Sequence, residues 1–189
     1  MIKSYSEILE AYTANGAESL KPSIPDLVAS LLCDKSASSN FRYLCSDICM
    51  DLKQFDAAIA LLKTQEEIGD LSDIGYNNLG YCYWECDEHE LAYRAFDRSL
   101  ELNPGNLSSL RGAAYCSIET PRTVQAVEIC RSFYEESGGT PEAALWYVTS
   151  LFNARDIATM SRILNERKEM HGIEPILSGF RCNDNDGPG

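Results

Sequence analysis

The sequence predicts an all-α protein built from consecutive pairs of antiparallel helices. Within residues 73–106, Gly80 and Ala92 are small enough for two helices to approach closely, and the rings of Tyr83 and Phe96 would fill the space beside them. A lone helix pair cannot bury its apolar face, so similar pairs are expected on both sides of this one. Residues that cap and end helices recur at matching intervals. Four such pairs and one further pair at the N-terminus give a total of about ten helices.

The spacing within residues 73–106 closely resembles a tetratricopeptide (TPR) repeat. That repeat has an aromatic, a Leu-Gly pair, a second aromatic, an Ala, an aromatic, a small residue and a closing Pro at fixed places. The resemblance implies a right-handed α-solenoid, and a binding scaffold rather than an enzyme. The matching residues are Tyr76, Leu79, Gly80, Tyr83, Ala92, Phe96, Ser99 and Pro104.

The same period divides the rest of the chain. The expected segments are N-terminal capping helices in residues 1–38, repeats in 39–72, 73–106 and 107–140, a degenerate repeat or capping pair in 141–174, and a disordered tail in 175–189.

The first of these repeats, residues 39–72, keeps its second helix better than its first. Cys45 and Ser46 replace the Leu-Gly pair, whereas Phe55 and Ala58 stand where the second helix needs them. Residues 107–140 match at Leu110, Ala113, Ala114, Ala126 and Cys130. The last window keeps only a helical pattern, in Leu145, Val148, Leu151 and Phe152, then Ile157, Met160, Ile163 and Leu164.

Helix-capping residues separate the segments. Ser72 and Thr140 each place a hydroxyl before a first turn that carries a carboxylate, and Thr120 does the same for a second helix. The turns at 103–106 and 138–139 contain glycine and end the preceding helices.

Two helical patterns, Tyr5–Ala14 and Asp26–Leu32, precede the first repeat. Pro22 and Pro25 separate them and break the match to the repeat. We therefore expect a capping pair here rather than a further repeat.

The composition excludes several classes of partner. The chain has 16 basic and 29 acidic residues, a formal net charge of −13 at pH 7. This charge repels phosphate backbones and anionic membranes, so neither nucleic acid nor a membrane is an expected partner. The sequence has no apolar run of about eighteen residues and no leader-like start, which predicts a cytoplasmic protein.

The eight cysteines are interpreted mainly as small core residues. Cys82 and Cys116 stand one repeat apart at a place that such repeats commonly fill with Ala. Cys82 and Cys86 share one helical face, so a thiol- or metal-dependent sensor is a third hypothesis for function. Zinc sites usually have two residues between paired ligands, and this spacing is absent here, so no metal and no cofactor is expected.

Catalytic patterns are scarce. His89 and His171 lie near a turn and a helix end, without a nucleophile motif around either. The chain also has no Gly-rich phosphate loop, and the acidic residues at 85–90 lack the spacing of a calcium loop. We therefore expect a non-catalytic protein.

The resemblance also implies where a ligand would bind. In a TPR solenoid the first helix of each pair lines a concave face, so its residues outside the signature are free to meet a peptide. Aromatic anchors and carboxylates dominate this set, which favours a basic or amphipathic segment. The candidate peptide-binding residues are Tyr43, Asp47, Met50, Asn77, Asn78, Tyr81, Trp84, Glu85, Arg111, Tyr115, Glu119 and Trp146, with Asp51 beside them.

The sequence argues against one well-known TPR activity. Repeats that capture the acidic tails of heat-shock chaperones use a clamp of Lys, Arg and Asn, of which this chain has only Asn78. Asp47 and Glu85 would repel an acidic tail. The leading hypothesis is an adaptor or chaperone-like module that binds a peptide segment of a partner. The alternative is a homo-oligomer or a subunit of a larger complex, joined through the terminal helices at 5–14 or 157–170.

Overall fold

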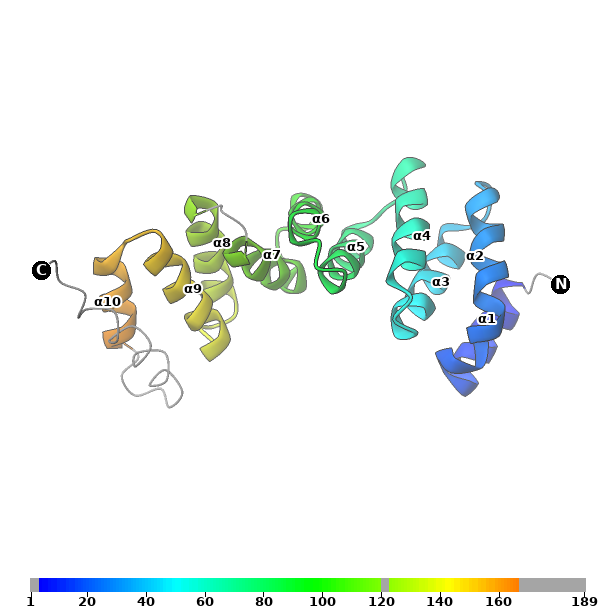
Figure 1. Cartoon of the computed structure of the whole chain (residues 1–189), viewed down its shortest axis with the longest axis horizontal. Coiled ribbons are helices and arrows are strands. Elements are labelled where there is room, and N and C mark those ends of the chain that lie inside the picture. Colours follow the sequence, from blue (N-terminus) through cyan, green and yellow to red (C-terminus); the bar gives the residue numbers. More distant parts are fainter. Residues whose placement is uncertain (1–3, 120–122, 167–189) are drawn as a thin grey trace, which may run out of the picture. The chain divides into compact units, whose positions relative to one another are not determined.

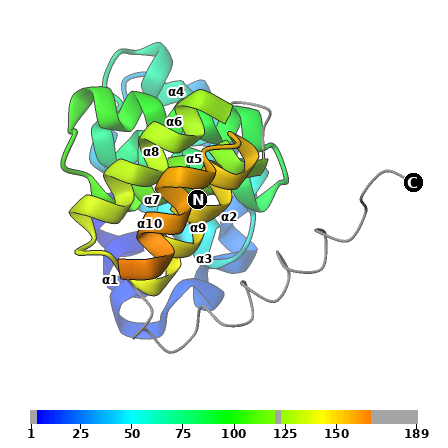
Figure 2. The ribbon, with the colours of Figure 1, turned by 90° about the vertical axis from the view of Figure 1, so that its left-hand side faces the viewer.

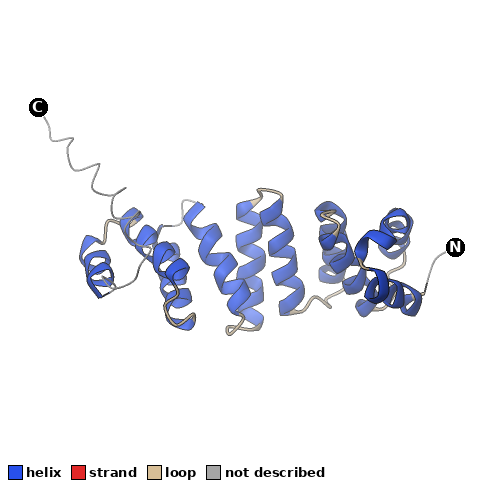
Figure 3. Ribbon diagram, turned by 90° about the horizontal axis from the view of Figure 1, so that it is seen from below, coloured by secondary structure: helices blue, strands red, loops and turns tan. Residues whose placement is uncertain are grey.

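The computed structural model describes residues 4–119 and 123–166. Within these ranges it contains ten α-helices, one short 3-10 helix and no strand (Figures 1 and 3). None of these helices combines the length and the apolarity that crossing a bilayer requires. The expected all-α architecture of about ten helices is confirmed. The elements are α1 (Tyr5–Asn15), η1 (Ala17–Ser23), α2 (Ile24–Cys33), α3 (Ser39–Asp51), α4 (Phe55–Glu67), α5 (Asp73–Glu85), α6 (His89–Leu102), α7 (Leu107–Glu119), α8 (Thr123–Glu136), α9 (Pro141–Asn153) and α10 (Ile157–Glu166).

The predicted helix starts agree with the structure at two caps. The hydroxyl of Ser72 accepts the backbone N–H of Gly75 at the start of α5. The hydroxyl of Thr140 accepts the backbone N–H of Ala143 at the start of α9. Such caps satisfy N–H groups that have no partner within the helix. The predicted cap at Thr120 and the predicted tail at 175–189 lie outside the described residues.

The segment before the first repeat contains an element that the sequence did not predict. Pro22 lies inside η1, a 3-10 helix between the two expected helices, and Pro25 lies in the first turn of α2. A 3-10 turn fits here because its bonding pattern tolerates a proline that would interrupt a longer α-helix. The two prolines therefore shape a compact connection.

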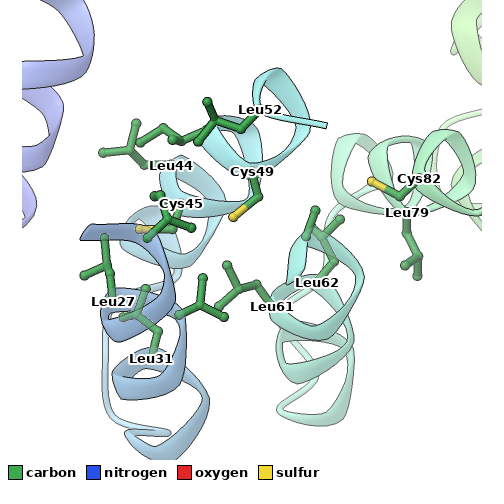
Figure 4. Packing of buried hydrophobic residues seen from close by; sticks show 14 of the residues in the cluster. Leu27, Leu31, Leu44, Cys45, Cys49, Leu52, Leu61, Leu62, Leu79 and Cys82 are labelled. Carbon is green, nitrogen blue, oxygen red and sulfur yellow. The ribbon is translucent and has the colours of Figure 1, made fainter. Parts of the chain in front are cut away.

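Two compact units, residues 1–112 and 113–189, divide the chain inside α7. We call them unit 1 and unit 2. In unit 1, side chains of α2, α3 and α4 point into one core, as Figure 4 shows for Leu31, Cys45 and Leu61. Cys45, Cys49 and Cys82 are fully buried in unit 1, so the prediction that these cysteines are core residues is confirmed.

In unit 1, the ring of Phe96 on α6 packs against two helices at glycines. A Cβ atom at Gly80 of α5 would lie 2.7 Å from Phe96 Cδ1, and one at Gly112 of α7 would overlap Phe96 Cζ. Real Cβ atoms do not approach carbon so closely, so each helix is near enough to touch the ring only because its side chain is missing. The predicted close approach at Gly80 is present, and Gly112 adds a second contact of the same kind.

We expect Gly80→Leu to lower the free energy of unfolding by about 1–3 kcal/mol or more, the penalty for overpacking a core. Combining it with Phe96→Leu should recover part of that loss, because the two side chains compete for one space. Chemical denaturation measures both effects. Gly105→Ala is the control, because its Cβ would meet Asn103 Oδ1 at an ordinary 3.6 Å. Equal stability of Gly80→Leu and wild type would remove the packing argument.

Arg42 connects the N-terminal helices to the first repeat. Its side chain is fully buried in α3, and its guanidinium donates to the carbonyls of Leu31, Asp34 and Ala37. It also donates to Gln65 Oε1 of α4 over 3.1 Å. Leu31 and Asp34 lie at the C-terminal end of α2, where carbonyls have no partner within the helix and the helix dipole favours a cation. One side chain thus joins α2, α3 and α4.

Arg42→Met should lower the free energy of unfolding by about 3 kcal/mol or more. Methionine fills a similar space but removes the donor to the buried carbonyl of Leu31 and to the buried amide oxygen of Gln65, and each unpaired group costs about 1–3 kcal/mol. Arg94→Met serves as the matched control, because Arg94 is exposed and pairs with Glu90 on the surface of α6. That change should stay within about 0.5 kcal/mol. A similar effect for both variants would contradict the structural role of Arg42.

Unit 2 is built around α8, α9 and α10, and α9 and α10 lie side by side in both views (Figures 1 and 2). Ala143 and Ala144 are buried on α9, and the ring of Phe133 on α8 is buried as well. Cys130 is also fully buried, as predicted, and its thiol lies 3.8 Å from the carbonyl oxygen of Ala114.

Candidate functional site

Side chains from α1, α3 and α5 meet on one face of unit 1. Asn78 Nδ2 donates a hydrogen bond to Asp47 Oδ1 over 3.2 Å, which links α5 to α3. Tyr12 Oη donates to Asp51 Oδ2 over 2.6 Å, which links α1 to the same helix. Because Asp47 and Asp51 are four residues apart, they lie on the same side of α3. The structure therefore brings together residues that are far apart in the sequence.

Aromatic rings continue this face along α5. The ring of Tyr81 meets that of Phe55 edge-on, with centroids 6.1 Å apart, and lies 5.8 Å from that of Trp84. Tyr81 Oη donates to Glu85 Oε1 over 2.5 Å. Residues 78, 81 and 85 share one side of α5 because they follow the helical period. We define the acidic face as Tyr12, Asp47, Asp51, Asn78, Tyr81, Trp84 and Glu85.

The carboxylates perturb the titration of this face. Burial, and then the charge of Asp51, raise the pKa of Asp47 to about 6. The hydrogen bond to Asp51 is the main cause that raises the pKa of Tyr12 to about 12. In the same way, the hydrogen bond to Glu85 is the main cause that raises the pKa of Tyr81 to about 12. Both phenols therefore remain donors at neutral pH, whereas Asp47 titrates close to it.

Sequence reasoning missed Tyr12 and Phe55 as members of this neighbourhood. Tyr12 lies on α1, outside the segments that follow the 34-residue period, so the repeat register gave no position for it. The sequence predicts a packing role in a second helix for Phe55, and the structure places its ring against Tyr81, next to the acidic face. Only the three-dimensional arrangement identifies these two side chains.

Three other predicted residues already hold structural contacts. The Tyr43 hydroxyl accepts the N–H of Ser72 over 2.8 Å and donates to the carbonyl of Asp70 over 3.2 Å. Asn77 Oδ1 accepts a hydrogen bond from the hydroxyl of Ser109, and Met50 packs against the core of unit 1. A ligand would compete with these contacts, and the ligand-binding role of the three residues stays a prediction.

The remaining predicted residues lie on α7 and α9. In unit 2, Trp146 meets the ring of Tyr115 edge-on at 5.7 Å and stacks on that of Phe133 at 5.5 Å. These contacts show a packing role for Trp146. Arg111 is exposed in unit 1. Glu119 ends α7, and its side chain lies outside the described part of the chain.

The pair Cys82 and Cys86, on which the sensor hypothesis rests, lacks the properties of a reactive thiol centre. Burial is the main cause that raises the pKa of Cys82 to about 12, and it also raises the pKa of Cys86. A thiol with a raised pKa is protonated at neutral pH and is therefore a weak nucleophile and a weak metal ligand. Among the described residues, no group of three or more His, Cys, Asp or Glu side chains is arranged to hold a metal ion. The structure gives no support to the thiol- or metal-sensor hypothesis.

Comparison with known proteins agrees with this geometry. Residues 74–106 match the family model described as tetratricopeptide repeat. The structure described as YrrB, a TPR protein with an unusual peptide-binding site, is similar at a TM-score of 0.65 and 15% identity, over 86% of this chain and 91% of that chain. The chain therefore contains a tetratricopeptide repeat at residues 74–106 and has the fold of the solved TPR structures.

Two further solved structures have the same fold. A MamA structure, AMB-1, is similar at a TM-score of 0.69 and 12% identity, over 88% of this chain and 96% of that chain. TPR-like repeats of a putative kinesin light chain from Podosopora anserina are similar at a TM-score of 0.58 and 12% identity, over 87% and 91% of the two chains. A comparison with curated protein sequences gave no match. The predicted α-solenoid of TPR pairs is confirmed, and this fold is typical of scaffolds for protein–protein interaction.

Asp47→Asn should raise the free energy of unfolding at pH 7.5 by about 1–2 kcal/mol, a figure reduced for the partial exposure of the carboxylate. Since folding raises the pKa of Asp47 above its unfolded value, the folded state favours the protonated carboxyl. The ionised form therefore destabilises the fold above about pH 6, and the penalty shrinks as the pH falls towards 4.

Urea denaturation at several pH values measures this difference. Asp56→Asn is the matched control, because Asp56 is an exposed carboxylate in the first turn of α4, where it favours the helix. That variant should gain no stability at any pH. A gain for Asp47→Asn that is the same at pH 4 and pH 7.5 would contradict the electrostatic explanation.

Proposed function

We propose that the protein is a non-catalytic adaptor or chaperone-like module that binds a basic or amphipathic peptide segment of a partner protein on the acidic face. The observation that carries this proposal is the position of Asp47. Its partly buried carboxylate destabilises the fold at neutral pH and accepts only one hydrogen bond from the described residues, that of Asn78. Residues that reduce stability in this way are concentrated at functional sites.

A Lys or Arg side chain of the peptide is the natural partner of this carboxylate. Asp47 and Asp51 together would hold one cation, and a cation that binds there would lower the pKa of Asp47 again. Tyr12 keeps its hydroxyl pointed at Asp51, so it orders the second carboxylate before the peptide arrives. Preorganised acceptors of this kind lose little entropy on binding.

The aromatic residues beside the carboxylates would supply most of the affinity. Tyr81 and Trp84 present large surfaces at low entropic cost, and either ring can stack on an apolar side chain or on a cation. The amide oxygen of Asn78 remains able to accept a peptide N–H, because its nitrogen makes the bond to Asp47. An apolar residue next to a basic one on the peptide fits this arrangement.

The charge of unit 1 supports a basic partner over an acidic one. In residues 1–112, acidic side chains outnumber basic side chains two to one. Complementary charge speeds association and rejects partners of the wrong sign. YrrB, a protein of similar fold, has a peptide-binding site, which supports a peptide ligand for this fold.

A selection from a random peptide display library tests the proposal. Wild-type protein should enrich peptides with Lys or Arg beside an apolar residue. For such a peptide, Trp84→Ala should weaken binding by on the order of 2 kcal/mol in a calorimetric titration, the loss expected for a central aromatic anchor. Leu102→Ala is the control, because Leu102 is an exposed apolar residue of α6 away from the acidic face.

The variant with both Asp47→Lys and Glu85→Lys should slow association, and binding of wild type should weaken as salt rises. Enrichment of peptides without a basic residue, or unchanged affinity in the folded variants, would reject the proposed site. The oligomer alternative rests on Tyr5 and Leu9, which are 38% and 36% exposed on α1. It predicts self-association in sedimentation experiments, which Leu9→Glu would abolish and Trp84→Ala would leave unchanged.

A further inference from the structure

Unit 2 contains a cleft of about 370 Å³ that lies between α8, α9 and α10. Its apolar lining is formed by Tyr147, Leu151 and Ile163, which are almost fully buried. Two exposed arginines line it from opposite helices, Arg131 from α8 and Arg162 from α10. This volume is at the lower end of the range for ligand sites and suits one or two side chains of a peptide.

Neither arginine forms an ion pair with a carboxylate whose side chain the structure describes. Two guanidinium groups at one apolar cleft form a ready site for an oxyanion, because each presents a planar fork of N–H donors.

Two carboxylates also line the cleft, and neither forms an ion pair with Arg131 or Arg162, although the charge of Arg162 helps to lower the pKa of Asp156. The Asp156 carboxylate accepts the backbone N–H of Thr159 over 3.1 Å and so caps the first turn of α10. Glu135 is exposed on α8. At the Tyr147 hydroxyl, burial raises the pKa, and Arg131 and Arg162 oppose that rise more strongly than Glu135 and Asp156 add to it. At this hydroxyl the two arginines therefore outweigh the two carboxylates.

We infer that this cleft is a second peptide-binding site, which takes an acidic side chain between Arg131 and Arg162 and an adjacent apolar side chain against Leu151 and Ile163. The apolar lining favours a peptide over a free anion, because a free anion would leave that surface uncovered. Elsewhere the acidic surface repels an acidic segment, so the cleft would be a rare place for one to bind. The site has the opposite charge preference to the acidic face and does not depend on it.

The test is an NMR titration of the intact chain with the probe N-acetyl-Glu-Leu-amide at constant ionic strength. Binding is followed through the backbone amide chemical shifts of the protein. N-acetyl-Gln-Leu-amide is the matched control peptide. The Glu peptide should bind at least about tenfold more tightly, and its shifts should map to α8, α9 and α10. Arg131→Gln and Arg162→Gln should each weaken it about tenfold, the loss expected for a charge-assisted hydrogen bond.

Glu135→Gln should bind the Glu peptide as tightly as wild type or a few-fold more tightly, because it removes a negative charge from the cleft. Arg94→Gln, on the surface of α6, should leave the affinity unchanged. Thermal unfolding of each variant separates a binding defect from a folding defect. If one arginine variant fails to fold, the other should still weaken binding of the Glu peptide, whereas Glu135→Gln should not.

Equal binding of the Glu and Gln peptides, or shifts outside unit 2, would overturn the inference. The protein is finally titrated with sodium phosphate and with sodium acetate. If either ion binds as tightly as the Glu peptide, the cleft holds simple oxyanions and the assignment to a peptide is wrong. Weaker binding of both ions supports the contribution of the apolar lining.

Discussion

Close contact between Phe96 and the bare backbones of two glycines is the constraint on which the repeat at the centre of unit 1 depends. The ring of Phe96 occupies the space that a side chain at Gly80 or Gly112 would need. Close packing of this kind leaves one arrangement of α5 and α6 at low energy, because interiors tolerate little change in volume. That arrangement fixes the orientation of α5, and α5 carries Asn78, Tyr81 and Glu85 outward on its other side.

Hydrogen bonds then connect this repeat to its neighbours. Asn78 meets Asp47 on α3, and Arg42 joins α3 to the end of α2 and to α4. Arg42 and Asp47 have opposite effects on the free energy of unfolding. Arg42 donates to the buried carbonyl of Leu31 and to the buried amide oxygen of Gln65, whereas Asp47 is a carboxylate that the fold would hold more easily as an acid. Unit 1 is thus stabilised by Arg42 in its core, whereas the ionised carboxylate of Asp47 on the acidic face reduces its stability. This combination is expected of a binding site.

The sequence predicted the residues whose role follows from local spacing. Gly80, Ala92 and Phe96 could be placed in advance because each has one packing role in a helix pair, and Ser72 and Thr140 because a cap needs only its own helix. Contacts between distant segments could not be placed in the same way. Tyr12 lies outside the 34-residue register, Gly112 stands at a place for which the signature specifies no residue, and the buried network of Arg42 depends on how α2 ends. The cleft in unit 2 is formed by three helices whose residues follow no motif.

The most direct measurement of the central claim is a double-mutant cycle across the acidic face. It combines Asp47→Asn in the protein with replacement of the basic residue by norleucine in a selected peptide. We expect a coupling energy of about 1 kcal/mol or more at pH 8, as is typical of a partly buried charge pair, and a smaller coupling at pH 5, where Asp47 is largely protonated. Strictly additive effects at pH 8 would show that Asp47 does not meet the peptide's charge, and the acidic face would then not be the site of a basic peptide.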